Sequence, residues 1–163
     1  YEGRHASIAI GILGDMGDDY ALSYLKAKFD SLTKDNDYID RFVRAIIKLE
    51  KNPIPFVKKW ADDDRIRRCL LRDLIFKDKK SSDDNLKTTI RSYLKEVLPE
   101  KEIEPCEAQI IDEHLVKNDP SYTKSEIRKK VLKKYSKVLK YQNAEYKEEQ
   151  EYFQKELKAF DGK

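Results

Sequence analysis

The sequence predicts an all-α protein made of about four antiparallel helix pairs. Apolar residues recur at helical spacing in most segments that lie between turn signals. Five glycines and five prolines are few for an all-β chain with many tight turns. Charged residues form 40% of the 163-residue chain and apolar residues 39%. This balance fits helices that share a core and keep large exposed faces.

The first helix pair begins with HASIAIGILG at residues 5–14. Ile8, Ala9 and Ile12 share one side of this helix, while Ile10 and Leu13 spread apolar character round it, so we expect neighbours on more than one side. The turn DMGD follows, where Asp18 is placed to accept backbone N–H groups as the N-cap of a second helix over residues 19–32.

The glycines at positions 11, 14 and 17 raise the alternative of a loop that cradles a phosphate. Such a loop needs a preceding strand and, in nucleotide hydrolases, a following Lys-Ser or Lys-Thr. Neither feature is present, and the aspartates at 15, 18 and 19 would repel a phosphate. The glycines therefore indicate a corner between two helices.

Three more helix pairs are predicted from apolar spacing and capping residues. The second pair joins residues 35–52 to 53–60, the third joins 62–76 to 81–98, and the fourth joins 104–118 to 123–140. Thr123 or Ser125 is the expected cap of the last of these helices. Ala9 and Ala45 are 36 residues apart, as are Leu13 and Leu49, a spacing typical of two-helix repeats.

The C-terminal part of the chain permits one long helix or two. No glycine or proline occurs between Thr123 and Phe160, and apolar residues recur there at intervals of seven: Leu132, Leu139, Tyr146, Phe153 and Phe160. Two helices would be joined by a bend near Gln142 and Asn143. In either case we expect this segment to cap the last repeat.

The segment AIGILGDMGDDYALSYL resembles the HEAT-like repeat, in particular its short phycobilisome-lyase type. The likeness covers about one repeat, within residues 5–32, and rests on Ala9, Leu13, Gly14, Gly17, Asp18, Ala21, Leu22 and Leu25. It implies a right-handed α-solenoid whose groove binds other proteins or, less often, nucleic acid, and rarely catalyses. Residues 1–122 are then HEAT-like repeats, and 123–163 are a basic helix and an amphipathic capping helix of the same domain.

The sequence predicts no enzyme, no metal site and no cofactor. His5 and His114 are the only histidines, and a zinc site at Cys106 and His114 would need two further ligands. The aspartates of ADDDR lack the spaced oxygens and the glycine of a calcium loop. Cys69 and Cys106 are interpreted as small core residues in a reducing compartment, which places the protein in the cytoplasm.

Two rows of basic residues are the candidate binding sites for an anionic partner. Arg65, Arg68 and Arg72 share one face of a helix, and a second row comprises Lys129, Lys133, Lys137 and Lys140. Solvated surface or contact with an acidic protein is the first interpretation of both rows. If they lined one groove, they could follow a nucleic-acid backbone.

We therefore expect a non-catalytic scaffold that binds another protein or forms part of a larger multi-repeat protein. The alternative is a nucleic-acid-binding solenoid that uses residues 65–80 and 124–141. No run of about 18 apolar residues is present to span a membrane. Because the chain begins at Tyr1, it is interpreted as a processed chain or a piece of a longer one, with a further repeat expected to pack on Ile8, Ile10 and Leu13.

Overall fold

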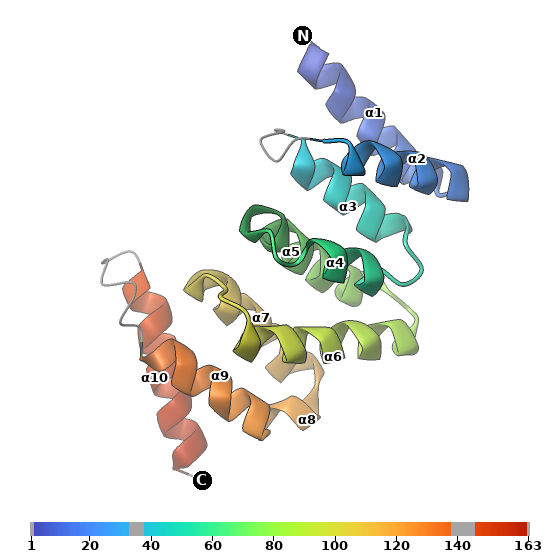
Figure 1. The fold of residues 1–163 in the computed structure, drawn as a ribbon. Coiled ribbons are helices and arrows are strands. Elements are labelled where there is room, and N and C mark those ends of the chain that lie inside the picture. The colour runs from blue at the N-terminus through green and yellow to red at the C-terminus, as the bar shows by residue number, and fades with distance from the viewer. Residues whose placement is uncertain (1, 33–37, 138–145, 163) are drawn as a thin grey trace. The chain divides into compact units, whose positions relative to one another are not determined.

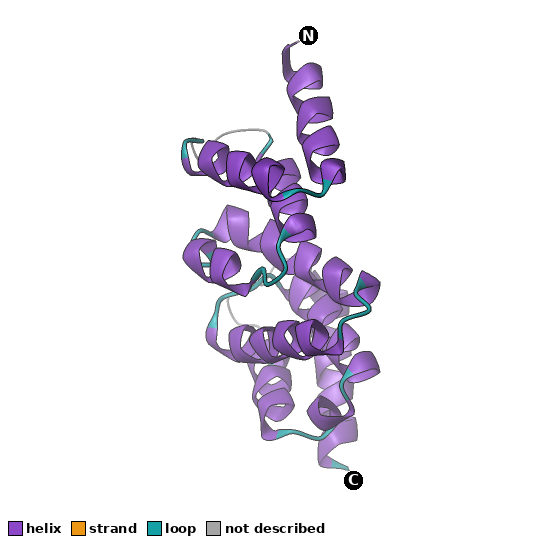
Figure 2. Cartoon of the chain, turned by 90° about the vertical axis from the view of Figure 1, so that its right-hand side faces the viewer, coloured by secondary structure: helices purple, strands orange, loops and turns teal. Residues whose placement is uncertain are grey.

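A computed structural model describes residues 2–32, 38–137 and 146–162 (Figure 1). Every regular element in these ranges is a helix, which confirms the all-α prediction (Figure 2). The helices are α1 (Glu2–Met16), α2 (Asp19–Asp30), α3 (Ile39–Leu49), α4 (Ile54–Trp60), α5 (Asp64–Lys80), α6 (Asp84–Glu100), α7 (Pro105–Asn118), α8 (Pro120–Thr123), α9 (Glu126–Ser136) and α10 (Lys147–Asp161). None of these described helices combines the length and the apolar character that crossing a membrane requires.

The chain forms two compact units. Unit 1 comprises Tyr1–Lys87 and unit 2 comprises Thr88–Lys163. The boundary lies inside α6, whereas the sequence-based division was placed between residues 122 and 123.

Polar side chains start several helices as the sequence predicts. The Asp18 carboxylate accepts from the backbone N–H of Ala21 at 2.6 Å and caps α2. Ser125, one of the two residues considered for this role, caps α9 by accepting from the backbone N–H of Arg128 at 3.1 Å. These contacts satisfy N–H groups that have no partner within the helix.

Unit 1 has a row of helices in which α3 lies between α1 and α5. Helix α2 packs on both α1 and α3, and helix α4 packs on α5. Helices α3 and α5 run in the same direction. Arg44 in the middle of α3 contacts Asp73 of α5 at 3.6 Å, and farther along both helices the Lys77 Nζ donates to the Ile47 carbonyl at 2.7 Å. Val43, Ile46, Leu25, Leu70 and Leu74 are fully buried in the core.

Helix α1 packs inward on the side that carries Ile10. Ile10 is buried, while Ile8 and Ile12 are more than half exposed. A Cβ on Gly14 would lie 3.1 Å from the Cβ of Ala45. Because glycine lets the two backbones come this close, α1 meets α3 through Ile10 and Gly14 and leaves Ile8 and Ile12 on its outer side.

In unit 2, the C-terminal segment forms two helices, α9 and α10, that lie side by side (Figure 1). Arg128 near the start of α9 pairs with Glu156, and Tyr135 near its end stacks on Phe153 with ring centroids 5.1 Å apart. The two helices therefore run antiparallel. Leu139 and the proposed bend at residues 142–143 lie outside the described residues.

Two glycine substitutions should have opposite effects on stability. Gly17 has a φ of 76°, in the left-handed region, so Gly17→Ala should lower the free energy of unfolding by about 1 kcal/mol. Gly11 is helical, and an added Cβ would meet nothing within 4 Å. Gly11→Ala should therefore raise that free energy by about 0.5 kcal/mol. Urea unfolding of both variants checks the pair, and a stabilising Gly17→Ala would contradict the described turn.

Candidate functional site

The basic row on α5 is present as the sequence predicts. Arg65, Arg68 and Arg72 are all exposed and lie within one side of the helix. The opposite side carries Leu70 and Leu74, which are fully buried. Residues 77–80, which lie between the predicted helices over 62–76 and 81–98, continue α5 to its end.

A second basic row lies on α3 and was missed in the sequence. Arg41, Arg44 and Lys48 are exposed, while Val43 and Ile46 on the other side of the helix are fully buried. The three cations have the spacing i, i+3, i+7, which places them on one helical face. The row on α5 has the same spacing, and that signal could have identified both rows.

One buried carboxylate joins the two rows. The Asp73 Oδ1 lies 3.6 Å from the Arg44 Nε, and its Oδ2 lies 3.5 Å from the Arg72 Nη2. Burial raises the pKa of Asp73, and the two guanidinium groups oppose this shift only in part. Because one carboxylate contacts both rows, the rows lie side by side. We call these six cations the basic face: Arg41, Arg44, Lys48, Arg65, Arg68 and Arg72.

A shallow groove of about 190 Å³ follows the crossing of α1 and α3. Arg41, Arg44 and Lys48 line it from α3, so the basic face continues to the edge of α1. On α1 the lining includes Gly11 and Asp15, and the Asp15 carboxylate pairs with the Lys48 ammonium. The groove can therefore accept an anionic group between exposed guanidinium groups.

The outer side of α1 and the start of α2 carry an apolar stripe. It consists of Ile8, Ile12, Met16, Tyr20 and Tyr24, with exposed fractions from 47% to 77%. Ile8, Ile12 and Met16 are spaced by four residues and run along one side of α1. The contiguous exposed row of Ile8, Ile12 and Met16 is typical of a surface that contacts another protein.

The second predicted row lies in unit 2 and is only partly available for binding. Lys133 and Lys137 are exposed. Lys129 instead pairs with Asp161 at 3.5 Å and lies 5.8 Å from the centre of the Phe160 ring. Lys140 lies outside the described residues. Because the two predicted rows belong to different units, the idea that they line one groove stays a prediction.

No metal cluster occurs in the part of the chain that the structure describes: none of its residues form a group of three or more His, Cys, Asp or Glu that could hold an ion. Cys69 and Cys106 are half-buried and form no disulfide. His114 is buried, and its Nδ1 lies 3.2 Å from the Asn118 side-chain nitrogen. His114 is therefore a buried residue of α7 whose ring contacts Asn118 one turn further along the same helix.

Comparisons with protein-family models, with curated proteins and with solved structures found no match. The resemblance of residues 5–32 to a HEAT-like repeat therefore stays a prediction.

Proposed function

We propose that this chain is a non-catalytic helical-repeat scaffold, a HEAT-like right-handed α-solenoid, whose basic face binds an acidic segment of a partner protein. The single observation that carries the proposal is the contact of Asp73 with both Arg44 and Arg72. It brings two rows of cations on neighbouring parallel helices into one surface. The row of α1, α3 and α5 is the kind of helix arrangement that a repeat protein uses to present such a surface.

The composition of the basic face favours carboxylates spaced along a protein over a continuous nucleic-acid backbone. Five of its six cations are arginines, whose planar groups bind carboxylates through two hydrogen bonds. Asp15 and Asp73 lie among them and interrupt the positive potential, which a track for phosphates would need to be continuous. The apolar stripe on α1 also supplies contact area of the kind that protein partners use.

The proposal predicts that a fluorescein-labelled acidic peptide, with glutamates alternating with leucines, binds this chain at low salt. Arg41 and Arg68 are exposed, so Arg41→Gln together with Arg68→Gln should weaken binding about tenfold, at about 0.7 kcal/mol per lost contact. Lys130→Gln with Lys133→Gln removes the same charge from exposed positions on α9, and this control should leave affinity unchanged. Fluorescence anisotropy measures all three proteins.

A variant that is expected to tighten peptide binding provides a second test. Asp73→Asn removes the negative charge between Arg44 and Arg72, so it should tighten peptide binding about threefold. Equal weakening by both double variants, or no binding of the peptide, would contradict the proposal. Tighter binding of a DNA duplex than of the peptide, lost in the Arg41 and Arg68 variant, would favour the nucleic-acid alternative instead.

A further inference from the structure

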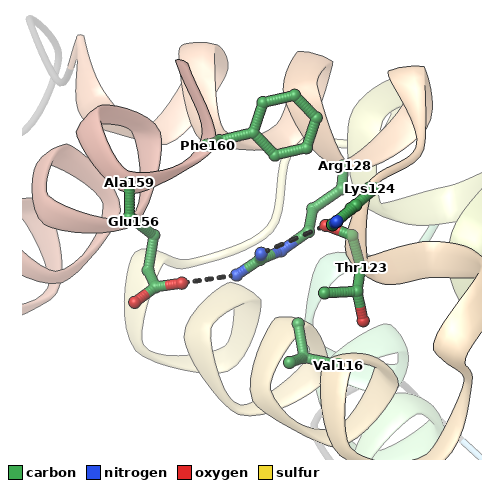
Figure 3. A pocket seen from close by; sticks show the side chains of 7 residues that line it. All are labelled: Val116, Thr123, Lys124, Arg128, Glu156, Ala159 and Phe160. Atoms are coloured by element: carbon green, nitrogen blue, oxygen red, sulfur yellow. Dashed lines mark hydrogen bonds and ion pairs between the residues drawn. The ribbon is translucent and has the colours of Figure 1, made fainter. Parts of the chain in front are cut away.

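Unit 2 contains a pocket of about 350 Å³ among α7, the end of α8, α9 and α10 (Figure 3). This volume lies within the range of small-molecule sites. Val116, Ala159 and Phe160 supply apolar lining, whereas Lys124, Arg128 and Glu156 supply the charged groups. This pocket lies outside the basic face and is independent of the function proposed for it.

Arg128 is held rigidly at this pocket. Its side chain is only 6% exposed. Behind it, the fully buried Asp112 accepts from the Arg128 Nε at 3.3 Å and Nη2 at 3.2 Å. The hydroxyl groups of Tyr122 and Tyr152 also donate to Asp112, at 2.8 and 2.9 Å. A guanidinium with so many partners keeps its orientation before a ligand arrives.

The hydrogen bonds of Arg128 leave one donor for a ligand. A guanidinium carries five N–H groups. The Nε donates to Asp112, and the Nη2 donates to Asp112 and, at 2.7 Å, to Glu156. The Nη1 donates to the Thr123 carbonyl at 3.3 Å. The second N–H of Nη1 therefore has no acceptor among the residues that the structure describes. Figure 3 shows the guanidinium at the centre of the pocket.

The charges that line the pocket favour an anion. Lys124 is exposed and has no ion pair within the described ranges. Glu156 is the one carboxylate among the lining residues, and it already accepts a hydrogen bond from Arg128. Counting Asp112 behind the guanidinium, two carboxylates balance the two cations. The attraction for an anion therefore comes from the exposed Lys124 ammonium and the remaining Arg128 N–H, which lie beside an apolar wall. A carboxylate attached to an apolar body matches both features.

We propose that this pocket binds a small apolar carboxylate. The carboxylate accepts hydrogen bonds from the Lys124 ammonium and the remaining N–H of Arg128. The apolar body packs against Val116, Ala159 and the ring of Phe160. The same chemistry is presented by a free organic acid and by the C-terminus of a peptide that ends in an apolar residue.

Two-dimensional NMR titration of the full chain tests the proposal with 3-phenylpropionate and with the peptide acetyl-Gly-Leu-Phe. Saturable shifts should appear for amides near Lys124, Arg128 and Phe160, at ligand concentrations up to about 10 mM. The neutral analogues, 3-phenylpropanol and the peptide amide, should bind at least about fivefold more weakly because they lack the charge. Binding of the acid alone identifies a free acid as the ligand class, and binding of the peptide alone identifies a C-terminus.

Two variants locate the site without disturbing the buried network around Arg128. Lys124→Gln should weaken 3-phenylpropionate binding about fivefold, whereas Lys130→Gln, an exposed lysine of α9 outside the pocket, should not. Ala159→Trp should fill the pocket and abolish the shifts, since Ala159 is exposed and the larger side chain need not enter the core. The proposal is overturned by the absence of saturable shifts, by equal binding of acid and alcohol, or by equal effects of the two lysine variants.

Discussion

Asp112→Asn should lower the free energy of unfolding of unit 2 by about 3 kcal/mol, because it breaks a buried ion pair by changing only one partner. Asp112 is fully buried and accepts hydrogen bonds from Arg128, Tyr122 and Tyr152. An asparagine keeps the shape but replaces one acceptor oxygen by an NH₂ group. That group faces donors, so at least one buried hydrogen bond is lost along with the charge.

The protonation of the two tyrosines supports this large effect. Burial raises the pKa of Tyr122 and of Tyr152 well above the ordinary value, and the negative charge of Asp112 adds to the shift. Both hydroxyls therefore remain donors throughout the neutral range and need an acceptor. In the Asp112→Asn variant the charge of Arg128 is balanced by Glu156 alone, at 2.7 Å.

Hydrogen exchange of the α7, α9 and α10 amides measures the loss in unit 2 directly. Glu156→Gln is the matched control, since it also removes one carboxylate from Arg128 but at a side chain that is 30% exposed. It should cost less than about 1 kcal/mol. If the two variants were equally destabilising, the buried contacts of Asp112 would not be what holds α7, α9 and α10 together.

The sequence could not predict the role of Asp112, because each of its partners is distant along the chain. Tyr122, Arg128 and Tyr152 lie 10, 16 and 40 residues away. In the segment EAQIIDEHL, Asp112 resembles its neighbour Glu113, which is exposed. Helix periodicity gives the side of α7 on which a residue lies, but not which polar residue of that side meets buried donors.

Local signals predicted the helices and one basic row well, while contacts between helices decided the rest. The spacing of Arg65, Arg68 and Arg72 is a property of one helix, so the sequence was enough to place them together. The joining of the α3 row to this row depends on Asp73, which a sequence presents as an ordinary helical aspartate. On α1, apolar residues occur round much of the helix, and the close approach at Gly14 determined the packed side.

Two lysines show why the number of basic residues in the sequence overstates the number of cations available to bind a partner. The Lys77 ammonium donates to the carbonyls of Ile47 and Lys48 at the end of α3, at 2.7 and 3.0 Å. Burial lowers the pKa of Lys77. In unit 2, the Lys134 ammonium donates in the same way to the Pro99 carbonyl at the end of α6, at 3.1 Å. Both cations complete helix C-termini, whose last carbonyls have no partner within the helix.

Phe29→Ala should lower the free energy of unfolding of unit 1 by about 4 kcal/mol, as expected for a large side chain removed from a packed core. Phe29 is 2% exposed. Its ring centroid lies 5.4 Å from that of Phe56 and 5.1 Å from that of Trp60, both on α4, and 6.4 Å from that of Phe42 on α3. This one side chain therefore joins α2 to both α3 and α4.

Trp60 makes this prediction measurable in unit 1 alone, because it is the sole tryptophan of the chain and its ring meets Phe29 edge-on at 88°. The alanine variant should shift the urea midpoint of Trp60 fluorescence downward and also move the native emission to longer wavelength, since water reaches the indole. Phe76→Ala is the control: Phe76 is 59% exposed, and its loss should change the free energy of unfolding by less than about 0.5 kcal/mol. Equal effects of the two variants would mean that α2 and α4 do not meet across Phe29. In that case the packing of α2 and α4 beside the helices that carry the basic face would differ from the described structure.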